Sequence, residues 1–126
     1  MSAMLLVFLG GGAGSVLRWL VGLAALRAFG PHFPYGTLIV NVSGCFVMGL
    51  MFRWLPLAAD GVPPSRLLVM TGVLGGFTTF SAFALDAAGL WMRQEHGLSA
   101  LYVALTLAST LVGVAAGLIV GKWVAA

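Results

Sequence analysis

Four long apolar stretches make up most of this chain, and each is long enough to cross a lipid bilayer as an α-helix. They cover residues 3–26, 35–55, 67–91 and 98–123. The hydrocarbon core of a bilayer needs about 20 helical residues, and within it every backbone amide must be paired inside the protein. The chain is therefore predicted to be an all-α membrane protein with four transmembrane helices.

Composition supports this fold class and excludes several functions. Of the 126 residues, 61% are hydrophobic and 7% are charged, whereas soluble domains carry about 25% charged residues. The length predicts a single transmembrane domain over residues 1–126. A net charge of +3, dispersed along the chain, is too small for a nucleic-acid-binding surface. The expected surroundings are a lipid bilayer, with no nucleic acid as partner.

The first stretch is predicted to be a transmembrane helix and not a signal peptide. No basic residue precedes Arg18, and three consecutive glycines interrupt the apolar run.

The third stretch is interrupted by GGFTTFSAF at residues 75–83. Backbone that unwinds at membrane depth is tolerated only where it is packed in protein or lines a cavity. We therefore predict that the third helix is broken in the middle of the membrane, beside a polar or ion-binding site. Phe80 and Phe83 share one helical face. Such residues usually face lipid or the core, but the positive edge of an aromatic ring can also stabilise an anion.

The distribution of basic residues bears on orientation. Four spans place both termini on one side of the membrane. One side then collects Arg53, Arg66 and Lys122, and the other collects Arg27 and Arg93. Because the positive-inside rule finds almost no bias here, two interpretations stay open. The chain inserts in both orientations and forms an antiparallel homodimer, or the first helix alone sets one orientation.

Polar side chains within the apolar stretches are candidate functional residues. Arg18 is costly at such depth, so it faces a water-filled vestibule or forms a structural tie. Asn41 offers two donors and one acceptor, with Thr37 one turn earlier on the same face. Its donors suit an anion, and an interhelical hydrogen bond is the alternative. Asp86 needs Arg18, a hydroxyl or water as its partner, or an aqueous vestibule.

The fourth stretch carries Tyr102, Thr106 and Thr110 at four-residue spacing. Three hydroxyls on one face predict a polar track for a small, partly dehydrated ion, although such hydroxyls also bond to their own helix carbonyls. The single cysteine, Cys45, is interpreted as a small packing residue. Glycines with four-residue spacing, at positions 10 and 14, 72 and 76, and 113, 117 and 121, predict close helix contacts.

Three motifs in order resemble the Fluc fluoride channel family, also called CrcB proteins. They are GGGAGSVLRW at residues 10–19, PYGTLIVNVSGCF at 34–46 and GGFTTFSAF at 75–83. The resemblance covers nearly the whole chain. It implies a dual-topology antiparallel homodimer with two pores in the inner membrane of a prokaryote. Such a dimer would conduct fluoride passively and selectively out of the cytoplasm and so relieve fluoride toxicity.

The resemblance also implies roles for individual residues. Arg18 and Asp86 would lie in a vestibule. The backbone carbonyls of Gly75 and Thr78 from both subunits would hold a structural sodium ion at the dimer centre, since carbonyls at broken membrane helices suit such a cation. The fluoride pore would be lined by Thr37, Asn41, Phe80, Ser81, Phe83, Tyr102, Thr106 and Thr110.

Other classes of protein fit less of the sequence. A proton-coupled four-helix multidrug exporter needs a carboxylate in its first helix, whereas Asp86 lies in the third stretch. A non-transporting assembly subunit would explain the glycine faces, but not Asn41, the hydroxyl row and the broken helix together. An enzyme is not expected, because His32 and His96 fall in loops and no nucleophile–base pair is visible.

Overall fold

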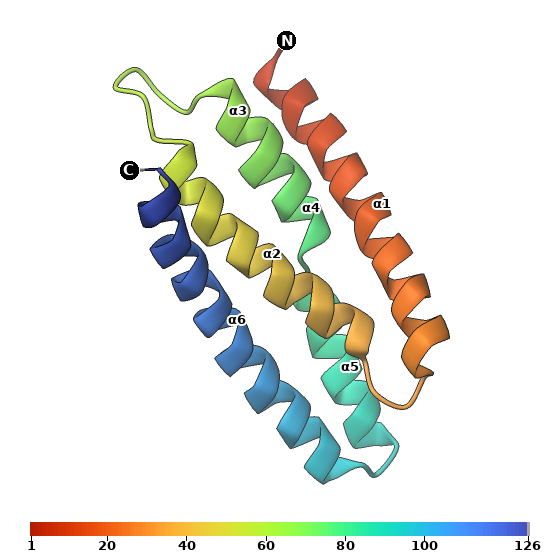
Figure 1. Cartoon of the computed structure of the whole chain (residues 1–126). Coiled ribbons are helices and arrows are strands. Elements are labelled where there is room, and N and C mark those ends of the chain that lie inside the picture. Colours follow the sequence, from red (N-terminus) through yellow and green to blue (C-terminus); the bar gives the residue numbers. More distant parts are fainter. Residues whose placement is uncertain (126) are drawn as a thin grey trace.

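The protein folds as a bundle of four membrane-length helical segments, seen in a computed structural model that describes residues 1–125 (Figure 1). All four segments are long and apolar enough to cross a membrane. This confirms the predicted helical fold, with boundaries that differ from the predicted ones by a few residues. The start of α1 and the end of α6 lie at the same end of the bundle (Figure 1). The elements are α1 (Ala3–Phe29), α2 (Tyr35–Trp54), α3 (Pro64–Arg66), η1 (Leu67–Leu74), α4 (Gly75–Phe77), α5 (Phe80–Met92) and α6 (His96–Val124).

Glycines set the closest helix contacts. Helices α2 and α6 run side by side (Figure 1), and a Cβ at Gly117 would overlap the Phe46 carbonyl oxygen. Helix α1 packs on η1 and α4 in the same way, and a Cβ at Gly14 would overlap the Val73 carbonyl oxygen. In lipid, such small residues let backbones approach and gain packing contacts. The predicted glycine faces are therefore confirmed as helix contact faces.

Replacing Gly117 with leucine is expected to destabilise the bundle, because the added side chain must push α6 away from α2. Overpacking of this kind costs about 1–3 kcal/mol or more. The matched control is Gly12→Leu on α1, where nothing lies within 4 Å of an added Cβ. Thermal unfolding in detergent, followed by circular dichroism, should give a clearly lower Tm for Gly117→Leu alone. Equal Tm values for the two variants would contradict the assigned contact.

The third segment, Pro64–Met92, is broken in the middle as predicted. The chain unwinds at Thr78 and Thr79, whose φ and ψ angles are −81° and 156°, and −153° and 122°. Gly75 and Gly76, at the start of the predicted interruption, are helical. Gly76 packs closely on α1, where an added Cβ would overlap the Gly11 carbonyl oxygen.

Two features flank this break. Before it, η1 is a π-helix, a rare form often found near functional sites, and the Gly75 N–H donates back to the Met70 carbonyl. After it, the Thr79 side chain accepts the Ala82 N–H at 3.2 Å, which is the bond of a helix N-cap. The N-cap bond of Thr79 therefore sets where α5 begins and the break ends.

Candidate functional site

Asn41 in α2 holds the unwound turn of the third segment. Its Oδ1 accepts the Thr79 N–H at 2.7 Å, and its Nδ2 donates to the Thr79 carbonyl at 2.8 Å. Both residues are buried, where an unpaired backbone group is costly. The interhelical hydrogen bond considered for Asn41 is therefore present. The carboxamide has a second N–H, so this bond does not use all of its donors.

The break separates two backbone carbonyls from the N–H groups that would bond to them in a continuous helix. In a continuous helix, the N–H groups of Thr79 and Ala82 would bond to the carbonyls of Gly75 and Thr78. Instead, Thr79 donates to Asn41 and Ala82 donates to the Thr79 hydroxyl. The released carbonyls belong to the two residues named above as sodium ligands. Gly75 is exposed on the protomer and Thr78 is half-buried.

A cavity of about 420 Å³ lies beside the break, between α2, the third segment and α6, and we call it the central cavity. Gly75 and Thr78 also line it. The cavity brings together five of the eight residues that the sequence predicts for a pore, namely Asn41, Phe80, Phe83, Thr106 and Thr110.

Phe80 and Phe83 form an aromatic pair at one side of the central cavity. Their ring centroids are 5.4 Å apart at an interplanar angle of 63°, which is an edge-to-face arrangement. Phe83 is buried, but Phe80 is 74% exposed on the protomer. The central cavity therefore reaches a surface of the protomer at Phe80.

The three predicted hydroxyls of α6 differ in their bonding. Tyr102 is fully buried and its hydroxyl donates to Asp86 Oδ2 at 3.2 Å. Thr110 donates to the carbonyl of Thr106 at 2.7 Å, which is the bonding to the helix's own carbonyls considered above. Thr106 is 4% exposed, and its Oγ1 has no hydrogen-bond partner among the described residues. Thr106 therefore offers a buried, unpaired hydroxyl to the central cavity.

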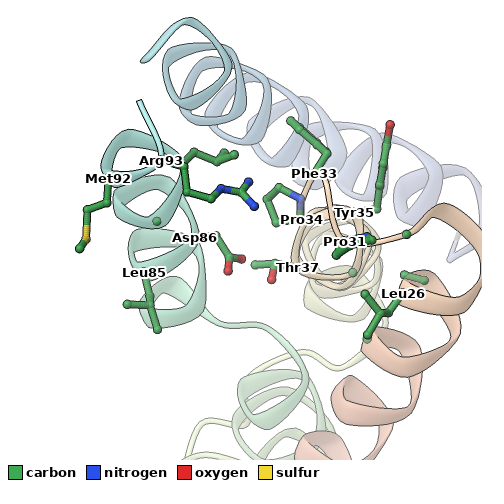
Figure 2. A pocket seen from close by; sticks show the side chains of 16 residues that line it. Leu26, Pro31, Phe33, Pro34, Tyr35, Thr37, Leu85, Asp86, Met92 and Arg93 are labelled. Carbon is green, nitrogen blue, oxygen red and sulfur yellow. The ribbon is translucent and has the colours of Figure 1, made fainter. Parts of the chain in front are cut away.

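A second cavity of about 630 Å³, the end cavity, lies where α1, α2 and α5 approach their connecting loops. Figure 2 shows the side chains of Asp86 and Thr37 pointing toward one another in it. Arg93 also lines it and donates to the His32 carbonyl at 3.2 Å. Thr37 and Asp86 are therefore brought together, but in a different cavity from Asn41.

Tyr102 connects the two cavities. Its hydroxyl bonds to Asp86 of the end cavity. Its ring lies 5.4 Å, centroid to centroid, from the ring of Phe83, which lines the central cavity. A path between the cavities would pass this tyrosine.

Three predicted site residues, Arg18, Ser81 and Tyr102, lie outside both linings. Arg18 is half-buried on α1, and the one ion pair within residues 1–125 joins Arg93 to Glu95 at 3.4 Å. The partner of Asp86 is thus a tyrosine hydroxyl, one of the types considered, and not Arg18. Ser81 is exposed, and its Oγ lies 3.2 Å from the Thr79 hydroxyl.

Sequence reasoning missed three residues of the central cavity, namely Thr79, Cys45 and the apolar Leu107. Thr79 both caps α5 and pairs with Asn41, and a threonine three residues before Ala82 was the available signal. Cys45, interpreted above as a packing residue, lines the cavity one turn after Asn41. Its spacing of four from Asn41 placed both on one face of α2.

Several bacterial proteins that resemble this chain over most of its length are named fluoride-specific ion channels. The chain is 54% identical over 114 residues to the fluoride-specific ion channel FluC 2 of Nitrobacter hamburgensis, covering 90% of this chain and 92% of that protein. It is 47% identical over 117 residues to the fluoride-specific ion channel FluC of Agrobacterium fabrum, covering 93% and 94%. It is 48% identical over 114 residues to FluC of Rhodopseudomonas palustris, covering 90% and 92%. The model of the family described as CrcB-like protein, Camphor Resistance (CrcB), matches residues 5–118, and the chain, a multi-pass membrane protein, belongs to this family.

Proposed function

We propose that this chain is a fluoride-selective passive ion channel and not an enzyme. The observation that carries the proposal is the central cavity. It gathers a carboxamide, an edge-to-face phenylalanine pair and an unpaired buried hydroxyl beside a broken helix. These groups offer N–H, O–H and ring-edge positive charge to an anion, and no Lys or Arg side chain lines the cavity to trap it. The relatives named as fluoride-specific channels support fluoride as that anion.

The proposed path runs through the central cavity. Arg18 would raise the anion concentration in a vestibule. The second N–H of Asn41 and the Thr106 hydroxyl would replace water lost by fluoride, and the edges of Phe80 and Phe83 would stabilise it weakly. Conduction requires such weak, successive sites. A narrow passage built for hydrogen bonding to a small anion would exclude chloride.

The direction of transport follows from electrochemistry. Neutral hydrogen fluoride crosses the membrane from acidic surroundings and dissociates in the cytoplasm. The trapped anion then leaves through the channel, because one charge crossing 100 mV gains about 2.3 kcal/mol. Export of fluoride from the cytoplasm requires the inner membrane of a prokaryotic cell, where the protein would relieve fluoride toxicity.

We also propose that the chain acts as a dual-topology antiparallel homodimer with two pores. The near-even split of basic residues supports insertion in both orientations. Phe80 and Gly75 are exposed on the isolated protomer, which suits a central cavity completed by a second copy.

A structural sodium ion at the dimer centre is part of this proposal. The carbonyls of Gly75 and Thr78 lack their helical donors, and carbonyl oxygens are suitable ligands for a hard cation. Residues 1–125 contain no group of three His, Cys, Asp or Glu side chains that would favour another metal. Two carbonyls from each subunit would hold the ion and cross-link the two broken helices.

The decisive experiment is fluoride efflux from liposomes that contain the purified chain, recorded with a fluoride electrode. We expect rapid fluoride release and no release of chloride under the same gradient. If a folded, dimeric sample releases no fluoride, the homodimeric channel is wrong, and a partner chain or the assembly-subunit alternative must be tested.

The hydroxyls of α6 provide a sharper test of the path. Thr106→Val removes an unpaired hydroxyl, so it should leave thermal stability unchanged but reduce fluoride efflux by about tenfold, the factor that corresponds to 1.4 kcal/mol. Thr110→Val is the matched variant. Its hydroxyl is already bonded to its own helix, so its effect on efflux should be smaller. The reverse order would contradict the role given to Thr106.

A further inference from the structure

We infer that Cys45 is a modification site on the wall of the fluoride path, accessible to small neutral thiol-reactive compounds. This inference rests on the proposed function, since it assigns the central cavity to the path. It concerns a residue that the sequence alone indicated as inert packing. Two independent observations carry it.

The first observation is the position of Cys45. It lines the central cavity together with Asn41, Phe80 and Thr106, and it is half-buried and not sealed in the core. It lies one helical turn from Asn41, on the same face of α2. A group attached to its sulfur would therefore project into the space beside the carboxamide.

The second observation is the unpaired hydroxyl that shares this space. Thr106 is 4% exposed, and its Oγ1 has no partner among the described residues. Buried polar groups are almost always hydrogen-bonded, so this hydroxyl indicates that the central cavity holds a mobile polar occupant such as water or an anion. The central cavity measures about 420 Å³ and reaches the protomer surface at Phe80, so a small neutral reagent can enter it from that side without passing the narrow part of the path.

The chemistry is the displacement of a sulfinate from a thiosulfonate, methyl methanethiosulfonate, by the cysteine thiolate. The Cys45 sulfur, as thiolate, attacks the methylthio sulfur, and the S–S bond of the reagent breaks. The products are a Cys45–S–S–CH3 disulfide and methanesulfinate, which carries away the electron pair, while the thiol proton passes to solvent. No oxidant is required. Because Cys45 is the single cysteine of the chain, the adduct has one possible location.

The adduct is expected to narrow the path. The added S–CH3 group would occupy the part of the cavity beside Asn41 and Thr106 with an apolar group. Fluoride efflux should fall by about tenfold, since conduction depends on every successive site. The change Cys45→Met provides a genetic counterpart, because its side chain has the same number of heavy atoms as the modified cysteine. It should show a similar loss without any reagent.

The experiment uses the full chain in liposomes at mildly alkaline pH. Efflux is recorded before and after the reagent, and the adduct is quantified by intact mass. We expect modification and inhibition together, both reversed by dithiothreitol, and no change on treating Cys45→Ser. Absence of an adduct in an efflux-active sample would overturn the inference, as would full modification with unchanged efflux.

Failure of the proposed function gives a separate result. It appears as absence of fluoride release before any reagent is added, whereas the present inference is tested by the ratio of treated to untreated efflux and by the adduct mass.

Discussion

Replacing Asn41 with leucine is expected to abolish fluoride efflux and to lower the stability of the protein. The change removes the bonds of 2.7 and 2.8 Å to Thr79 and leaves a buried N–H and a buried carbonyl without partners. Each unpaired group costs about 1–3 kcal/mol. The unwound turn would then lose its fixed geometry, and the central cavity would lose its carboxamide donor.

The matched control for Asn41→Leu is Ser43→Ala on the same helix. Ser43 is exposed, and its hydroxyl donates to the Ile39 carbonyl of its own helix at 2.6 Å. Its removal should leave Tm and efflux close to those of the unmodified chain. Thermal unfolding and liposome efflux on both variants provide the measurement. Normal efflux from Asn41→Leu would show that Asn41 is outside the path.

Replacing Phe80 with isoleucine is expected to reduce fluoride efflux by at least about tenfold. Conduction requires sites that bind the anion weakly, and the positive edge of the Phe80 ring is proposed as one of them, whereas isoleucine has no such edge. Phe80 is 74% exposed on the protomer, so the change should have little effect on protomer folding. The loss of efflux would then report on conduction and not on stability.

Phe8→Ile in α1 is the control for this change, because it repeats the substitution at a phenylalanine that is also 74% exposed but does not line either cavity. Size-exclusion chromatography checks that both variants assemble like the parent chain. Equal efflux from the two variants would remove Phe80 from the proposed pore.

The helices of this fold could largely be predicted from the sequence, because a segment that crosses the bilayer must be apolar over about 20 residues. The four predicted segments and the break in the third were found in the structure. The glycine faces were readable for the same reason, since four-residue spacing in an apolar helix has few uses other than close packing.

The candidate site was only partly readable. The choice between donor, acceptor and structural tie for Asn41 depends on which backbone groups lie opposite, and Thr79 is 38 residues away. The partner of Asp86 could equally have been Arg18 by residue type. The structure instead provides the hydroxyl of Tyr102.

The sequence by itself determined the membrane fold, the number of spans, the presence of a broken helix and the family. These depend on hydropathy, spacing and motifs, which are local along the chain. Only the tertiary structure decided that the chain unwinds at two threonines, that Asn41 binds that turn, and that Cys45 shares a cavity with the unpaired Thr106 hydroxyl. Such pairings depend on the rotation and axial shift of one helix against another, which are set by close packing at glycines such as Gly14 and Gly117 and have no local signature.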